Sequence, residues 1–234
     1  MIPELEIASF VGGLFAGVLA CMELGRRIGI RRASKRPESS NLGLGSVEGS
    51  VFALLGLLMA FSFSGAASRF DLRRQLIVNE ANAIGTAYLR LDLLPAAERD
   101  KLREEFRRYV DARLDVYRLP AGEVEAQAAS DRSVAIQGEI WRDAVAACRM
   151  DGTPQTATLV VPALNEMIDL VTSRAAARSV HQPILIYAVI ALLAFACGLL
   201  AGHDMSSFPR RPWFHMISFS AMVALTMYVI LDLE

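Results

Sequence analysis

Residues 49–67 read GSVFALLGLLMAFSFSGAA, and no charged side chain interrupts this run. A helix that crosses a bilayer needs about twenty consecutive residues that are mainly apolar. The run also lacks the alternation of polar and apolar residues that marks a half-buried strand. We therefore expect residues 49–67 to form a membrane-spanning helix.

Three further segments have the same apolar character: residues 7–22, 184–201 and 213–231. The last two each follow a proline, which suits the first turn of a helix because its missing N–H would have no partner there. After the first segment, Glu23 precedes Arg26 and Arg27 by three and four residues, so a continuing helix pairs these charges at the membrane edge. A cleaved signal peptide is the rival interpretation, but the start MIPELE is acidic where such a peptide is basic. The sequence thus predicts four spans.

The composition agrees with a membrane protein and excludes several other classes. Hydrophobic residues make up 53% of the 234 residues, and the mean hydropathy is +0.35. The 24 Lys and Arg residues against 25 Asp and Glu residues give a net charge of −1, so no basic excess exists to neutralise nucleic-acid phosphates. Cys21, Cys148 and Cys197 are too few for a disulfide framework, and two of them lie in apolar segments.

Between the second and third spans the chain becomes polar and amphipathic. Apolar residues at helical spacing, interrupted by Pro95, Pro120 and the Pro154 turn, predict helices over residues 71–94, 96–119, 123–150 and 155–180. No strand pattern occurs in the sequence. We therefore predict an all-α protein with four transmembrane helices and a helical bundle inserted between helices two and three. The divisions are residues 1–68, the extramembrane domain 69–180, and residues 181–234.

The arginines and lysines predict how the chain is oriented in its membrane. The two short connections carry eight: Arg26, Arg27, Arg31, Arg32, Lys35, Arg36, Arg210 and Arg211. The membrane ends of the middle domain carry five: Arg69, Arg73, Arg74, Arg174 and Arg178. Because basic residues near membrane ends favour the cytoplasmic side, the count places the middle domain outside the cytoplasm.

No motif in the sequence predicts catalysis or a cofactor. Gly43 to Gly49 has the spacing G-x-G-x-x-x-G without the preceding strand that a dinucleotide site requires, so it predicts only a flexible connection. The histidines, His181, His203 and His215, show no metal-ligand spacing. His203 beside Asp204 could respond to pH, since imidazole titrates near neutrality. We expect a protein that is not an enzyme and that holds no metal or cofactor.

The second span offers two candidate pore stripes. One contains Gly49, Phe52, Gly56, Ala60 and Phe63, and the other contains Ser50, Leu57, Ser64 and Ser68. In a symmetric oligomer, either stripe would form apolar constrictions with polar flanks, a pattern that suits gating by dewetting. Glu48 and Arg69 would form charged entrances. The alternative is that the serine hydroxyls bond to their own helix backbone.

Glycine pairs in two spans predict close helix packing. Gly13 and Gly17 in the first span, and Gly198 and Gly202 in the third, each form the small-xxx-small pattern that lets helices approach in lipid. Packing within one protomer explains these ridges without an oligomer.

Several stretches resemble a bacterial membrane family of unknown function that is called bestrophin-like. They are SVEGSVFALLGLLMAF at 46–61, Phe70-Asp71, NEANAIGTAYL at 79–89 and PALNEMID at 162–169. The resemblance extends over nearly the whole chain, including two spans on each side of a helical middle. It implies an ion channel of five copies, with Phe52, Gly56, Ala60 and Phe63 as candidate neck positions. It also implies a cytoplasmic helical domain, opposite to the arginine count.

Two functions follow as expectations. The first is a homo-oligomeric ion channel in which the second span lines the pore, with Phe52, Gly56, Ala60, Phe63 and Ser64 as lining candidates. The second is a non-conducting sensor or scaffold, whose helical domain docks a partner through a stripe of Leu76, Ile77, Ile84, Tyr88 and Leu91. In either case the partners are the lipid bilayer and further copies of the chain, with inorganic ions for the channel and no nucleic acid.

Overall fold

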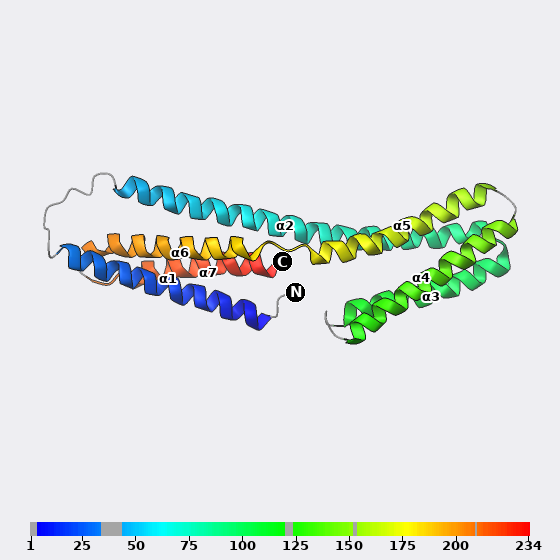
Figure 1. The fold of residues 1–234 in the computed structure, drawn as a ribbon, viewed down its shortest axis with the longest axis horizontal. Coiled ribbons are helices and arrows are strands. Elements are labelled where there is room, and N and C mark those ends of the chain that lie inside the picture. The colour runs from blue at the N-terminus through cyan, green and yellow to red at the C-terminus, as the bar shows by residue number, and fades with distance from the viewer. Residues whose placement is uncertain (1–3, 34–43, 120–123, 152–153, 209) are drawn as a thin grey trace. The chain divides into compact units, whose positions relative to one another are not determined.

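The computed structural model describes residues 4–33, 44–119, 124–151, 154–208 and 210–234 (Figure 1). The α-helices are α1 (Glu4–Ala33), α2 (Leu44–Arg90), α3 (Ala96–Arg118), α4 (Val124–Asp151), α5 (Pro154–Ser179), α6 (Ile184–Asp204) and α7 (Trp213–Asp232). Two short 3-10 turns, η1 (Leu91–Leu93) and η2 (Met205–Ser207), follow α2 and α6. The described residues contain no strand, so the all-α prediction is confirmed.

Four helical stretches are long and apolar enough to cross a membrane: Leu5–Arg32, Gly45–Leu93, Pro154–Ser207 and Trp213–Asp232. The predicted number of spans is therefore confirmed. Pro183 and Pro212 cap the N-termini of α6 and α7, as their positions before the apolar segments predicted. Helix α2 continues without a break over 47 residues, so the span expected at residues 49–67 and the helix expected from residue 71 form one helix. No proline lies between its apolar and amphipathic halves to interrupt the backbone hydrogen bonds.

The chain forms two compact units. One contains Met1–Asp71 with His181–Glu234, and the other contains Leu72–Val180. We call them the membrane unit and the helical unit.

Small residues set the packing of the membrane unit, in which α1 lies against α6 and α7 (Figure 1). A Cβ atom added at Gly202 would meet the Met22 carbonyl, and one added at Gly25 would meet the Leu199 carbonyl. Glycine at these positions is what allows the backbones of α1 and α6 to touch. The Gly198-xxx-Gly202 ridge thus packs within the protomer, whereas a Cβ at Gly13 would meet open space.

The helical unit has its own apolar core. Its fully buried side chains include Leu91, Leu102, Phe106, Ile140 and Leu164, which come from η1, α3, α4 and α5. Amphipathic helices bury their apolar faces against one another, which explains why the unit is compact without strands.

Candidate functional site

Helix α2 has a buried and an exposed side in the membrane unit. Leu55, Met59, Ser62 and Ala66 are buried, at three- and four-residue intervals that place them on one side of the helix. The opposite side is exposed and contains Ser50, Ala53, Gly56, Leu57, Ala60, Phe61, Ser64 and Ser68.

The exposed side of α2 differs in chemistry from those of α6 and α7. Helix α6 exposes Ile184, Leu185 and Leu192, and α7 exposes Phe214 and Met222, all large side chains suited to lipid tails. The exposed side of α2 instead alternates serine, alanine and glycine with a few large residues. Small residues and hydroxyls are typical of surfaces that approach another helix or water within a membrane.

The predicted pore residues differ in their exposure on the protomer surface. Gly56, Ala60, Phe63 and Ser64 are exposed on the protomer surface, and a Cβ added at Gly56 would meet open space. Phe52 is half-buried, and its ring meets that of Phe219 edge-on, with 5.9 Å between centroids. Phe52 therefore contributes to packing within the protomer, while the other four remain available to a neighbouring copy or to water.

Two serine hydroxyls of α2 form hydrogen bonds within the protomer, and only one of them is an arrangement considered from the sequence. Ser50 donates a hydrogen bond of 2.9 Å to the Ser46 carbonyl, which is the backbone alternative. Ser62 faces the protein and accepts a hydrogen bond of 3.0 Å from Gln182.

Arg69, a predicted entrance residue, is paired within the protomer. Its guanidinium forms an ion pair with the Glu234 carboxylate and donates a hydrogen bond of 3.3 Å to the Gln182 side-chain oxygen. Ser62, Gln182, Arg69 and Glu234 thus form a chain of contacts that ties α2 to the segment before α6 and to the C-terminal end of the described chain. This pairing could not be predicted from the sequence because Glu234 lies 165 residues away from Arg69.

Glu48, the other predicted entrance residue, lies beside the end of α6. Ligand atoms of Glu48, His203 and Asp204 all lie within 4.8 Å of one another. Two carboxylates and an imidazole could hold a divalent cation of intermediate softness. No metal site was expected from the sequence, because Glu48 and His203 are far apart in the chain and show no ligand spacing.

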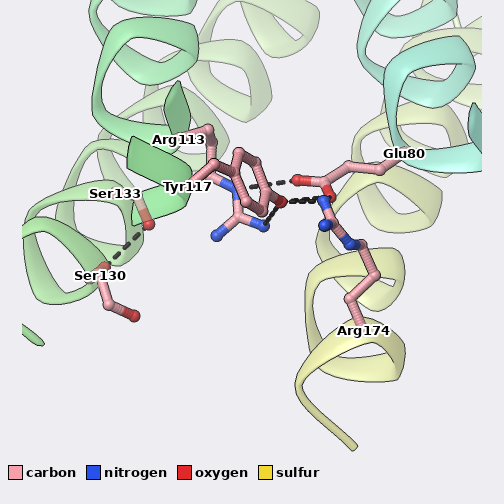
Figure 2. Close-up of polar contacts among 6 residues, drawn as sticks. All are labelled: Glu80, Arg113, Tyr117, Ser130, Ser133 and Arg174. Atoms are coloured by element: carbon pink, nitrogen blue, oxygen red, sulfur yellow. Dashed lines mark hydrogen bonds and ion pairs between the residues drawn. The ribbon is translucent and has the colours of Figure 1, made fainter. Parts of the chain in front are cut away.

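A second polar cluster lies inside the helical unit, centred on Glu80 of α2 (Figure 2). Arg113 of α3 donates to the Glu80 carboxylate through Nε at 2.8 Å, and Arg174 of α5 forms an ion pair with the same carboxylate. Tyr117 donates its hydroxyl to Glu80 at 3.1 Å and accepts hydrogen bonds from both arginines. Three helices are thereby joined through one carboxylate.

The Glu80 cluster is desolvated, and its charges do not cancel. The side chains of Glu80, Arg113 and Arg174 retain only 4%, 9% and 9% of their exposure. One carboxylate therefore neutralises one of two buried guanidinium charges. Burial lowers the pKa of Arg174, although an arginine stays protonated under all ordinary conditions.

A further polar cavity of about 630 Å³ lies between α2 and α5 in the helical unit. Its polar lining residues are Asn79, Asn82, Thr86, Asn165, Glu166, Asp169 and Ser173. The stretches 79–89 and 162–169, on which the family resemblance rests, therefore meet at one place in the fold.

The docking stripe proposed from the sequence is largely core. Leu91 is fully buried, and Ile84 and Tyr88 pack against the apolar core of the helical unit. Only Ile77, with 49% exposure, is well exposed to solvent. The stripe is therefore a poor free surface for a partner.

Sequence reasoning missed Arg113 and Arg174 as functional candidates. Arg113 lies one turn before Tyr117, on a helix whose other arginines are mostly exposed. The available signal was a tyrosine and an arginine at i, i+4 spacing beside the apolar face, but this spacing does not say which arginine becomes buried.

The Bestrophin-like domain matches residues 12–234, which is nearly the whole chain. No curated protein and no solved structure matches the chain.

Proposed function

The chain belongs to the Bestrophin-like family, and on that premise we propose that it forms a homo-oligomeric ion channel with α2 around the central axis. Each protomer is a membrane protein, since four helical stretches are long and apolar enough to span a bilayer. The family resemblance suggests five copies in a bacterial inner membrane. The protein has no catalytic role in this proposal.

The observation that carries the proposal is the exposed side of α2. Ser50, Gly56, Ala60 and Ser64 keep part of this surface narrow and partly polar between the exposed Leu54, Leu57, Phe61 and Phe63, whereas α6 and α7 expose mainly large apolar side chains. A narrow surface lets several copies of α2 approach a common axis. The serines would then line a water-filled pore, and Leu57 and Phe63 would form apolar constrictions between the serines.

The buried side of α2 supports the same arrangement. Leu55 and Met59 belong to the core of the membrane unit, so that core fixes which side of the helix faces away from the protomer. Arg69 is held by Glu234, which fixes the polar end of the same apolar run. A pore helix needs such a fixed rotation, because a turn of the helix would replace serines by leucines on the axis.

The test is ion flux through the purified protein in liposomes, under gradients of K⁺, Na⁺ and Cl⁻. Ser64→Trp fills the narrow side of α2 and should abolish flux, whereas Phe63→Ala widens a constriction and should increase it. Ala221→Trp is the matched control, since it adds the same side chain at an exposed position of α7 and should leave flux unchanged.

Two results would refute the proposal. The first is the absence of flux from a verified, ordered oligomer across a range of pH and Ca²⁺ concentration. The second is equal loss of flux in Ser64→Trp and Ala221→Trp, which would place the ion path away from α2.

A further inference from the structure

A small cavity of about 180 Å³ in the helical unit is lined by three arginines and three apolar residues. Arg73, Leu76 and Ile77 come from α2, and Arg174, Ala177 and Arg178 come from α5. Within the described part of the chain, no carboxylate lines this cavity. Since a water molecule takes up about 30 Å³ in the liquid, the cavity has room for a tetrahedral oxyanion.

The surroundings of the cavity are positively charged and held in place. Arg174 is buried, and its guanidinium carbon lies 4.4 Å from the centre of the Tyr117 ring. Arg178 lies over the same ring, at 5.5 Å. The Glu80 carboxylate pairs with both Arg113 and Arg174, so it cannot neutralise both of these guanidiniums. Cation–π and ion-pair contacts therefore hold the Arg174 guanidinium in place, and a cation–π contact places the exposed Arg178 over the same ring.

Both walls of the cavity are close in sequence to membrane segments. Arg73 follows the end of the apolar run 49–67 by six residues, and Arg178 precedes the start of α6 at Ile184 by six residues. Basic side chains this close to a span lie within reach of lipid headgroups.

We propose that the Arg73/Arg174/Arg178 cavity binds a phosphate group, carried either by an anionic lipid headgroup or by a free phosphate ion. Guanidinium groups match phosphate oxygens in pairs of parallel hydrogen bonds, and such charge-assisted bonds are the strong ones. The bound anion would supply the negative charge that Glu80 alone does not provide. Leu76 and Ile77 form an apolar wall beside the arginines, which suits a ligand with an acyl portion next to its phosphate.

This site goes beyond ion conduction and does not depend on it. A phosphate held by Arg73 on one side and by Arg174 and Arg178 on the other would join α2 to α5. Because such a ligand binds only the folded unit, it should stabilise that unit against unfolding.

The experiment measures ligand binding by the purified full chain, followed by its thermal unfolding. In one arm the protein is in detergent and is titrated with inorganic phosphate at constant ionic strength, with sodium chloride as the reference. In the other arm it is in nanodiscs of phosphatidylcholine with increasing phosphatidylglycerol. Arg178→Gln is the principal variant because Arg178 is exposed and its loss leaves the Glu80 pairs intact. Arg149→Gln, at an exposed arginine of α4, is the matched control.

We expect the wild-type chain to be stabilised in at least one arm and Arg178→Gln to raise the apparent Kd about tenfold, as loss of one charge-assisted hydrogen bond predicts. Stabilisation by phosphatidylglycerol alone would identify a lipid headgroup, and stabilisation by inorganic phosphate alone would identify a free ion. The proposal is overturned if neither probe stabilises the wild-type chain. It is equally overturned if Arg149→Gln weakens binding as much as Arg178→Gln. Arg73→Gln, on the opposite wall, should reproduce the Arg178→Gln result.

Discussion

Replacement of Glu80 by glutamine tests the role of the buried cluster directly. The carboxylate faces Arg113 at 2.8 Å and also pairs with Arg174, and all three side chains are at least nine-tenths buried. Glutamine keeps the size and one acceptor oxygen but leaves two guanidinium charges without a counter-charge. Removing one member of a buried ion pair costs about 3–5 kcal/mol, because the remaining charge stays desolvated. We expect a loss in this range for the helical unit.

Hydrogen–deuterium exchange of backbone amides is the appropriate assay, because it reports the local stability of α3 and α5 in the full chain. A loss of about 3 kcal/mol should accelerate exchange in these helices by roughly a hundredfold. Glu104→Gln is the matched control: Glu104 pairs with Arg107 on the exposed surface of α3, where such a pair contributes about 1 kcal/mol or less. Exchange that is no faster in Glu80→Gln than in Glu104→Gln would refute the reasoning.

An apolar replacement separates the cost of an unpaired charge from the value of the cluster. If Glu80, Arg113 and Arg174 are replaced together by leucine, methionine and leucine, no buried charge is left behind. Such replacements are often neutral or stabilising by about 1–4 kcal/mol. We therefore expect the triple variant to exchange more slowly than Glu80→Gln. A triple variant as unstable as the single one would mean that packing at these positions, rather than charge, carries the effect.

Three further predictions concern other parts of the chain. Burial, and to a smaller extent a neighbouring carboxylate, raises the pKa of Glu105 to about 7. Between about pH 4.5 and 7 the Glu105 carboxyl therefore stays protonated in the folded unit, whereas it is ionised in the unfolded chain. Stability should therefore fall as pH rises through this window, by at most about 3 kcal/mol, and Glu105→Gln should remove the decline in exchange measurements; an unchanged pH profile would contradict this. Gly202→Ala, which sets a Cβ against the Met22 carbonyl, should lower the melting temperature in detergent, whereas Gly56→Ala in open space should not; equal effects would contradict the packing argument. The arginine count predicts that a cysteine at Glu125 is labelled by an impermeant maleimide in intact cells, and labelling only after lysis would instead place the helical unit in the cytoplasm.

Local sequence signals predicted most of the fold. Apolar runs, prolines at helix starts and helical spacing depend only on residues close together in the chain, and they predicted four spans and an all-α middle. The same signals did not decide whether the span at residues 49–67 continues into the helix from residue 71, and in the structure both belong to α2. An apolar run followed by an amphipathic pattern has the appearance of two helices, although no residue between the two stretches breaks the helix.

The polar pairings could not be predicted in this way. Glu80 meets Arg113 and Arg174 across 33 and 94 residues, and many other arginines in the same segments had equal local character. Which arginine is buried depends on how three helices pack, and a single sequence contains no direct measure of that. The Glu48 and His203 contact is hidden for the same reason. By contrast, the exposure of Gly56, Ala60, Phe63 and Ser64 agrees with the stripe pattern of α2, while their role in a pore stays a prediction.

The balance of charge separates two kinds of arginine site in this protein. Arg69 forms an ion pair with Glu234, so the two charges balance, and we assign this pair the role of holding α2 in place. Glu80 instead serves both Arg113 and Arg174, and these buried arginines retain one net positive charge. A buried excess charge is costly unless an ion or ligand compensates it. The cavity beside Arg174 opens where that excess lies, so the under-compensated cluster, rather than the balanced pair, is where an anion would bind and stabilise the protein.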